Sequence, residues 1–510
     1  MAIELAGLLA AVTPIEVVGV PAGSVSAITY NSGEVAPGAC FVAVRGRKSD
    51  GHAYIADALQ RGATLIVGED PAPADFPVDR VYLRVADSRR DLGTLSAAFY
   101  GHPTQHMEVI GVTGTDGKTT TTNLIDALLS AAGKRTGLMS TVDFKIGERR
   151  WPNNSRFTTL EAPEVQEVLA QMRAAGVETA IVETTSSGLA LRRVEGVQYD
   201  MAVVTNITSE HLEVHGTLEN YRRAKAMLCE AVDPTRTKPL SSQPPHACVL
   251  NADDSSFEYL QPFCNAPILS YGIESAADVR AEDLVLEPTG TQFRACFPDG
   301  TRLAVRTPLV ARFNVSNCLA ALAVGYLHGL APDAMAGAME HFSGVSGRME
   351  RVDAGQPFIV VVDYAHTADS LAKALGALRP VTAGRLIVVF GSAGDRDRVK
   401  RPEMGAVAAQ MADFAVITDE DPREEDAASI LREIAAGAEK AGWKEGQQFV
   451  CIVGRRDGIA AAFRRAQPDD TVLLAGKGHE QSIIIGRVKT PWDDRTVARE
   501  ELAVLGYGAR

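Results

Sequence analysis

The sequence predicts an α/β protein of three domains. Its 510 residues are more than one hydrophobic core usually organises, and about three domains is the expected number for this length. Runs of branched apolar residues alternate with helical patterns over most of the chain, as in parallel strands joined by helices. Breaks rich in glycine and proline separate residues 1–105, 106–345 and 346–510, which are the expected domains.

The composition narrows the class of protein. A hydrophobic content of 46% with 23% charged residues is typical of a globular protein in water, and a net charge of −13 argues against nucleic acid as the partner. No apolar run reaches the ~18 residues that a transmembrane helix needs. The seven cysteines are scattered, odd in number and free of any C-x-x-C pair, which predicts a reduced, cytoplasmic protein without structural zinc.

The first expected domain, 1–105, mixes short strands and helices. Its first residues, MAIELAGLLAAVTPIEVV, contain an apolar stretch that carries Glu4 and has no Lys or Arg before it. A signal peptide normally has basic residues before its apolar region, so we expect a short amphipathic helix here instead.

The strands expected in the other two domains share one feature: each runs from branched apolar residues into polar ones. They are 107–114, 179–186 and 201–208 in the middle domain, and 358–367, 386–397, 414–423 and 472–480 in the last. Open parallel sheets bind ligands beyond the carboxyl ends of their strands, so an enzyme is expected rather than a scaffold. The proline-rich stretch 233–247 is expected to be an irregular surface loop.

The segment VIGVTGTDGKTTTTNLIDALL, 109–129, has the pattern of a strand, a glycine loop and a helix in that order. Gly114 and Gly117 allow backbone amides to turn toward a phosphate, and the helix N-terminus adds partial positive charge. Lys118 can reach the β- and γ-phosphates and the Thr119 hydroxyl suits Mg²⁺, although Val112 stands where the strict motif has its first glycine. The sequence therefore predicts a site for a nucleoside triphosphate.

A Mg²⁺ ion at this loop requires oxygen ligands, usually a carboxylate or two beside phosphate oxygens and water. Glu183 follows the apolar residues 179–182 and is the natural candidate, with a helix-capping or surface glutamate as the alternative. The apolar strand before it favours the ligand.

The loop GVTGTDGKTTTT resembles the ATP loop of the Mur ligases, cytoplasmic enzymes that add amino acids to UDP-N-acetylmuramic acid. Most members carry Asn where this chain has Asp116, so the Asp116 side chain is expected to point away from the phosphates. FNVSN, GRME and VVDYAHT, which end at residues 317, 350 and 367, resemble further nucleotide contacts of the family. The resemblance implies that ATP contacts Gly114, Thr115, Asp116, Gly117, Lys118, Thr119, Thr120, Asn317, Arg348, Asp363 and His366.

The segment 203–228 is a second match to the family. The resemblance implies that His211 lies beside the metal and that CO₂ carbamylates Lys225 to N6-carboxylysine, whereas composition alone would make Lys225 a solvated helix lysine. The implied catalytic residues are Lys118, Glu183, His211 and Lys225, and the implied Mg²⁺ ligands are Thr119, Glu183 and His211.

Segments 28–55, 156–163 and 183–194 resemble the family's contacts to the UDP-N-acetylmuramoyl dipeptide. The residues implied are Tyr30, Ser32, Arg47, Lys48, Ser49, Thr158, Thr159, Thr185 and Arg193. The better-known pattern has His and Gln where this chain has Ser187 and Leu191. Losing an amide donor there is expected to weaken a polar contact by about 1 kcal/mol, with Arg192 as a candidate replacement.

Three stretches of the last domain, 391–405, 418–426 and 475–481, resemble the branch of the family that adds the third amino acid to UDP-N-acetylmuramoyl-L-alanyl-D-glutamate. The implied contacts to that amino acid are Arg396, Glu420, Asp421, Pro422, Arg423, Gly476 and Glu480. The resemblance implies a mixed α/β uridine-binding domain, a central P-loop ATPase domain with a mostly parallel sheet, and a Rossmann-like C-terminal domain.

The identity of the third amino acid depends on the turn at 420–423. Members that use meso-diaminopimelate carry Asp-Asn-Pro-Arg there, whereas this chain reads Glu-Asp-Pro-Arg. Arg423 can pair with a carboxylate through two hydrogen bonds. The anion at Asp421, however, would repel a distal carboxylate and attract a distal amine. The charges therefore favour L-lysine or L-ornithine, with meso-2,6-diaminopimelate as the alternative.

The implied activity is that of an ATP-dependent amide ligase in peptidoglycan precursor synthesis, which forms an acyl phosphate on the acceptor before the amine attacks. The expected partners are the UDP-N-acetylmuramoyl dipeptide and a diamino acid, with ATP and Mg²⁺ as cofactors, and the expected state is a monomer. Two alternatives stay open. One is a sibling ligase, such as folylpolyglutamate synthase or the D-alanyl-D-alanine-adding enzyme, and the other is a nucleotide-switched binding protein without catalysis.

Overall fold

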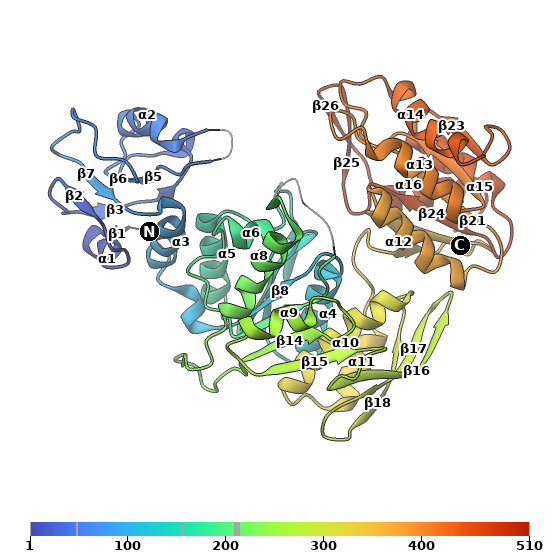
Figure 1. Cartoon of the computed structure of the whole chain (residues 1–510), viewed down its shortest axis with the longest axis horizontal. Coiled ribbons are helices and arrows are strands. Elements are labelled where there is room, and N and C mark those ends of the chain that lie inside the picture. The colour runs from blue at the N-terminus through green and yellow to red at the C-terminus, as the bar shows by residue number, and fades with distance from the viewer. Residues whose placement is uncertain (1, 47–48, 156, 209–214, 509–510) are drawn as a thin grey trace. The chain divides into compact units, whose positions relative to one another are not determined.

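The computed structural model of the chain describes residues 2–46, 49–155, 157–208 and 215–508 (Figure 1). Its internal contacts divide the chain into two compact units. The first unit consists of Met1–Val279 with Leu319–Ala334, and the second of Arg280–Cys318 with Met335–Arg510. The boundaries of the three expected domains stay a prediction.

The first unit begins with a five-stranded sheet in the order β2-β7-β6-β5-β4. Its strands are β2 (Glu16–Val18), β4 (Ile28–Thr29), β5 (Cys40–Val42), β6 (Leu65–Gly68) and β7 (Val81–Arg84). Side chains alternate between the two faces, where α1 (Leu5–Leu9) and α3 (Ser88–Phe99) pack on one and α2 (Ile55–Gln60) on the other. Helix α1 is the short helix expected at the start of the chain, and its Leu5 and Leu8 are buried.

The same unit contains a larger sheet whose parallel strands follow the order β9-β12-β8-β13-β14-β15. They are β8 (Glu108–Thr113), β9 (Thr136–Met139), β12 (Thr179–Glu183), β13 (Met201–Val204), β14 (Ala247–Asn251) and β15 (Ile268–Gly272). Antiparallel strands β10 (Asp143–Ile146) and β11 (Arg149–Pro152) extend the sheet beyond β9. Its helices include α4 (Lys118–Ala131), α5 (Ala162–Ala174), α6 (Ser186–Ala190), α8 (Leu218–Glu230) and α9 (Phe257–Leu260). Every residue of β8, β12 and β13 is buried, as in parallel sheets covered on both faces.

The second unit contains an antiparallel meander of β16 (Val279–Glu287), β17 (Gly290–Cys296) and β18 (Arg302–Thr307). Helices α10 (Arg312–Leu327) and α11 (Pro332–Glu340) follow it in the chain. The unit's main sheet has six strands in the order β19-β20-β24-β21-β22-β23. They are β19 (Glu350–Val352), β20 (Ile359–Asp363), β21 (Leu386–Phe390), β22 (Phe414–Thr418), β23 (Phe449–Ile452) and β24 (Thr471–Ala475).

Helices cover both faces of this six-stranded sheet (Figure 1). One face carries α12 (Ala368–Leu378), α13 (Lys400–Met411) and α14 (Ala427–Lys440), and the other carries α15 (Arg455–Arg465) and α16 (Asp494–Val504). The hairpin of β25 (Ser482–Ile485) and β26 (Val488–Pro491) follows β24. Because β20, β24, β21 and β22 are parallel neighbours, the segments that follow them begin at the same edge of the sheet.

The strands expected from the sequence in the middle and last domains all form, so the predicted α/β fold is confirmed. The proline-rich stretch 233–247 is irregular up to its last residue, as predicted, but it is not wholly a surface loop. Lys238 within it is buried, and its ammonium donates hydrogen bonds to the carbonyls of Met107 and Gln198 and to the carboxylate of Asp200. Within the described ranges, no helix is long and apolar enough to cross a membrane.

Candidate active site

The phosphate loop joins β8 to α4 and is held by the segment that follows β13. Gly114 and Gly117 have φ angles of 151° and 80°. A side chain at Gly114 would meet the Thr205 hydroxyl at 1.8 Å, so no larger residue fits. The amide of Thr115 donates to the carbonyl of Asn206 at 2.7 Å, which fixes the loop before any ligand binds.

Lys118 and Thr119 begin α4, as the motif predicted. The Lys118 ammonium donates hydrogen bonds to the carbonyls of Gly114 and Thr115, at 3.0 and 2.7 Å. The Thr119 hydroxyl donates to the carboxylate of Glu183 at 3.0 Å. These contacts place the lysine, the hydroxyl and the carboxylate of the predicted site at one loop.

Glu183 ends β12, the parallel neighbour of β8, and is only 1% exposed. Its carboxylate also accepts a hydrogen bond from the Thr141 amide at 2.7 Å, and the Thr141 hydroxyl lies 2.8 Å away. A surface glutamate is therefore excluded. A buried carboxylate beside a hydroxyl is a hard oxygen donor set, so the described residues fit Mg²⁺. His211, the other predicted ligand, lies outside the described residues.

Composition alone predicted that Lys225 is a solvated helix lysine, and this prediction is wrong. Lys225 projects from α8, is 1% exposed, and donates a hydrogen bond from its ammonium to the carbonyl of Gly114. The ammonium also lies 4.6 Å from the centre of the Tyr221 ring, and the Tyr221 hydroxyl is 3.1 Å from that of Thr115. Burial beside the phosphate loop thus comes from the fold and not from the local pattern.

Some of the residues predicted to contact the muramoyl dipeptide belong to a network of hydroxyl groups beside Glu183. The hydroxyls of Thr141 and Thr158 are 3.0 Å apart, and so are those of Thr159 and Thr185. Arg193 donates to the carbonyl of Thr159 at 3.1 Å and pairs with Glu161 at 2.8 Å. Thr141 was missed because it stands in no recognised motif. Glu161 was missed although it lies within the matched segment 156–163.

The uridine-side residues lie in the five-stranded part of the first unit. Tyr30 is half-buried, and burial together with the charge of Glu164 raises the pKa of its hydroxyl. Ser32 begins a short 3₁₀ helix, Ser32–Glu34, and Ser49 is exposed. Arg47 and Lys48 lie outside the part of the chain that the structure describes.

Arg192 was the candidate replacement for the polar groups that Ser187 and Leu191 lack. Its φ is 55°, and its guanidinium pairs with Glu195 at 3.3 Å. A contact of Arg192 with the substrate stays a prediction.

The remaining nucleotide-side residues belong to the second unit. Asp363 ends β20, and its carboxylate accepts hydrogen bonds from the amides of Met349 and Ala365 at 2.8 and 2.9 Å. Burial raises the pKa of Asp363 and lowers that of His366. The Arg348 guanidinium lies 4.8 Å from the centre of the Tyr364 ring.

Two further details concern these residues. The Arg348 Nε is buried, with no hydrogen-bond partner among the described residues. Asn317 is 4% exposed in α10, and its amide donates to the side-chain oxygen of Asn314 at 3.1 Å.

The turn after β22 holds the residues predicted to contact the third amino acid. Asp421 is 7% exposed, and its Oδ1 accepts a hydrogen bond from the amide of Ile484 at 3.0 Å. The ammonium of Lys477, whose side chain is fully buried, lies 2.9 Å from the same oxygen and 2.5 Å from Glu480 Oε2. Lys477 therefore offsets part of the negative charge of Asp421, because it is shared with Glu480. Lys477 was missed, although it stands between the predicted Gly476 and Glu480.

Glu420 and Arg423 belong to the same turn, and each has a buried polar atom without a hydrogen-bond partner among the described residues. Burial raises the pKa of Glu420, and its Oε2 has no hydrogen-bond partner in the described part of the chain. Gly476, with φ of 110°, leaves room beside that oxygen: a Cβ there would lie 3.2 Å from it. Arg423 adopts φ of 52° and has a buried Nε that likewise lacks a partner in the described ranges. Arg396 is exposed.

Comparison with known proteins agrees with this geometry. Three family models match the chain: the Mur ligase family catalytic domain at residues 24–100, the Mur ligase middle domain at 112–325, and the Mur ligase glutamate ligase domain at 347–478. A UDP-N-acetylmuramyl-tripeptide synthetase from Roseiflexus sp. (strain RS-1) is 49% identical over 488 residues, which are 95% of this chain and 96% of that protein. The chain belongs to the Mur ligase family.

This Mur ligase is also 41% identical to a UDP-N-acetylmuramoyl-L-alanyl-D-glutamate–2,6-diaminopimelate ligase from Bacillus velezensis, over 94% of this chain and 95% of that protein. A solved structure of a ligase with the same name has a TM-score of 0.70 and 29% identity, covering 99% of this chain and all of the other. The predicted family, fold and enzyme class are thus confirmed: the chain is an ATP- and Mg²⁺-dependent ligase that forms an amide bond.

Proposed function

We propose that this Mur ligase joins meso-2,6-diaminopimelate to the D-glutamyl carboxylate of UDP-N-acetylmuramoyl-L-alanyl-D-glutamate in cytoplasmic peptidoglycan precursor synthesis, acting as a monomer. The relatives support this amino acid over the L-lysine or L-ornithine that the charges of the turn favoured. Several of them, including one from Geobacillus thermodenitrificans that is 44% identical over 93% of this chain, are named for 2,6-diaminopimelate.

The ion pair between Asp421 and Lys477 carries the proposal. The sequence argument treated Asp421 as a free anion that repels a distal carboxylate. Its partner at 2.9 Å weakens that repulsion, although the same ammonium also pairs with Glu480, and a partly compensated Asp421 can occupy the place of the neutral Asn found in diaminopimelate enzymes. The buried Nε of Arg423, which has no partner among the described residues, then offers a hydrogen bond to a carboxylate of the ligand.

In the proposed reaction, the D-glutamyl carboxylate attacks the γ-phosphorus of ATP, the bond to the bridging oxygen breaks, and ADP leaves. The amine of diaminopimelate then attacks the acyl carbon of the acyl phosphate. Phosphate leaves with its bonding electron pair, and the new amide nitrogen loses its extra proton to solvent. Lys118, at the start of α4, places its positive charge where negative charge develops on the phosphate.

Thr119 and Glu183 would hold Mg²⁺, with His211 as a further proposed ligand. When bound, the ion supplies positive charge to the phosphate oxygens. Lys225 is proposed to carry the carbamate, which would convert a buried cation beside the Gly114 carbonyl into an anion. The nucleotide contacts proposed in the second unit are Asn317, Arg348, Asp363 and His366.

The acceptor is proposed to lie along the hydroxyl network that leads away from Glu183. Thr158 and Thr159 offer hydroxyls, and Arg193 offers a cation beside the Thr159 carbonyl. Tyr30, Ser32, Arg47, Lys48 and Ser49 are proposed for the uridine end.

The test is phosphate release by the purified protein with ATP, Mg²⁺ and UDP-N-acetylmuramoyl-L-alanyl-D-glutamate. Meso-diaminopimelate, L-lysine and L-ornithine are supplied one at a time, and the product is identified by mass spectrometry. We expect the highest kcat/KM with diaminopimelate. A higher value with L-lysine or L-ornithine would refute the assignment of the amino acid, and no release with any of the three would refute the reaction.

A further inference from the structure

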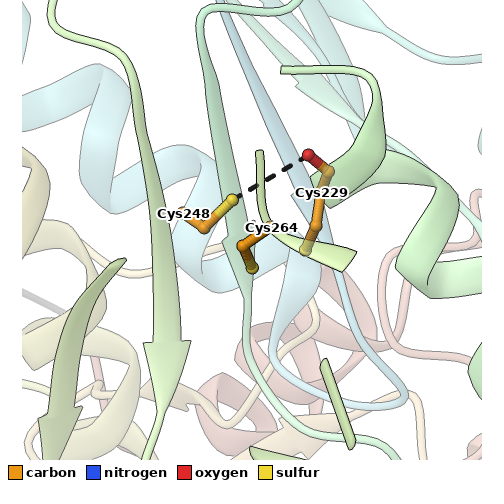
Figure 2. Close-up of side chains that lie close together, drawn as sticks. All are labelled: Cys229, Cys248 and Cys264. Carbon is orange, nitrogen blue, oxygen red and sulfur yellow. Dashed lines mark hydrogen bonds between the residues drawn. The ribbon is translucent and has the colours of Figure 1, made fainter. Parts of the chain in front are cut away.

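Three cysteines from separate elements converge in the first unit. Cys229 lies in the last turn of α8, Cys248 in β14, and Cys264 directly after the 3₁₀ helix Gln261–Phe263 (Figure 2). Their sulfur atoms all lie within 4.8 Å of one another. Within the described ranges, no other group of three or more His, Cys, Asp or Glu side chains is this close.

The cluster sits at the edge of the hydrophobic core. Cys229 and Cys248 are fully buried, whereas Cys264 is half-buried and gives the cluster its access to solvent. Apolar residues such as Leu260 and Ala266 belong to the same core cluster. All three cysteines are free thiols.

Two of the thiols donate hydrogen bonds to backbone carbonyls. The Cys248 thiol donates to the carbonyl of Cys229 at 4.0 Å, the dashed line in Figure 2. The Cys264 thiol donates to the carbonyl of Leu260 at 3.5 Å. A metal ion binds cysteine as the thiolate, so binding here would release the thiol protons.

The spacing of the sulfurs matches coordination by one ion. With metal–sulfur bonds of about 2.3 Å, sulfurs around a tetrahedral ion lie roughly 3.8 Å apart, and around a trigonal ion roughly 4.0 Å. Sulfurs within 4.8 Å reach either arrangement by moving about 1 Å or less. Thiolates select thiophilic ions such as zinc(II) and copper(I), whereas Mg²⁺ requires oxygen ligands.

We propose that Cys229, Cys248 and Cys264 bind one zinc(II) ion, at a site separate from the Mg²⁺ and ATP site. Each sulfur donates an electron pair to the ion, the three thiol protons leave to solvent, and water completes the coordination on the Cys264 side. Sequence spacing predicted no structural zinc, because these cysteines form no short-spaced motif. The fold brings them together instead.

Such a site would join the end of α8 to β14 and to the turn at 261–264. Lys225 lies one helical turn before Cys229 on α8, so the ion would also restrain the helix that carries Lys225. Because the unfolded chain does not assemble the three sulfurs, binding should raise the thermal unfolding midpoint.

The test uses the full chain, purified anaerobically with a non-thiol reductant, loaded with Zn²⁺ and freed of excess by gel filtration. Bound zinc is counted by elemental mass spectrometry, and its affinity is measured against a chromophoric chelator. We expect one zinc per chain in the wild type. Cys264→Ser should bind it at least about 100-fold more weakly, since the loss of a direct ligand should exceed the effect of losing an outer-shell partner. The matched control is Cys451→Ser, another half-buried cysteine outside the cluster, which should keep the wild-type affinity.

A second measurement needs no variant. Bound zinc should protect the peptides that contain Cys229, Cys248 and Cys264 from alkylation, but not the peptide that contains Cys451. Equal zinc retention by Cys264→Ser, or no retention by the wild type, would overturn the proposal. Retention of copper(I) but not zinc(II) in a parallel anaerobic titration would overturn the choice of ion. Loss of two thiols to a disulfide during loading, without bound metal, would overturn the site.

Discussion

Replacing Lys477 with Met tests whether this lysine is what allows a carboxylate to approach Asp421. The substitution removes the cation that lies 2.9 Å from Asp421 and 2.5 Å from Glu480, and so leaves one more uncompensated negative charge in the turn. At about 5 Å from a ligand carboxylate and an effective dielectric constant of about 20, that charge costs roughly 3 kcal/mol. We expect kcat/KM for diaminopimelate to fall about 100-fold.

The assay is phosphate release with each amino acid in turn. The same added charge attracts a distal amine, so the ratio of kcat/KM for L-lysine to that for diaminopimelate should rise at least as much. Adding Asp421→Asn to Lys477→Met should recover part of the diaminopimelate activity, since it removes the negative charge that Lys477 no longer offsets. Lys489→Met, at an exposed lysine of the neighbouring hairpin, is the matched control.

Two results would refute the reasoning. One is an unchanged kcat/KM for diaminopimelate in Lys477→Met, which would mean that the turn's charge does not reach the ligand. The other is an equal fall for all three amino acids with no recovery in the double variant, which would mean that Lys477 acts on folding alone. Urea unfolding of each variant separates that loss from the specificity effect.

Three other predictions follow from the buried charges. Lys225→Ala should lower turnover by orders of magnitude, and an added short-chain carboxylic acid should partly restore it; full activity without the additive would rule out a carbamate at this position. Lys238→Met leaves the buried Asp200 without its cation, so urea unfolding should show a loss of about 3–5 kcal/mol, and Lys238→Met combined with Asp200→Asn should lose less. Burial and the charge of Arg348 lower the pKa of His479 to about 3. The unfolded chain therefore binds more protons than the folded one between about pH 3 and 6.5, and stability should fall as the pH drops through this window. His479→Gln should flatten that slope, and an identical pH profile in the variant would contradict a buried neutral imidazole.

The phosphate loop is a part of the structure that neighbouring residues in the sequence predict. Gly114, Gly117, Lys118 and Thr119 are neighbours in the chain, so their spacing alone predicted the turn, the start of the helix and the groups that face a phosphate. Strands such as β8 and β12 were equally predictable, because fully buried parallel strands have continuous apolar sequences.

Lys225 and Asp421 are residues whose surroundings the local sequence did not predict. Local pattern made Lys225 a surface lysine, yet packing of α8 against the phosphate loop buries it beside Gly114. The charge of Asp421 was visible in the sequence, but its partner Lys477 stands 56 residues away. The amino-acid specificity predicted from the turn alone therefore left out the positive charge of Lys477.

By itself, the sequence determined the α/β class and the nucleotide loop, because these depend on residue type and short-range spacing. Most other candidate site residues came from the resemblance to the family, and their roles stay predictions. Only the tertiary structure decided which charges are compensated, which lysines are buried and which cysteines meet. Those properties depend on distances between segments far apart in the chain, and chain connectivity constrains such distances only through the packing of the sheets and helices.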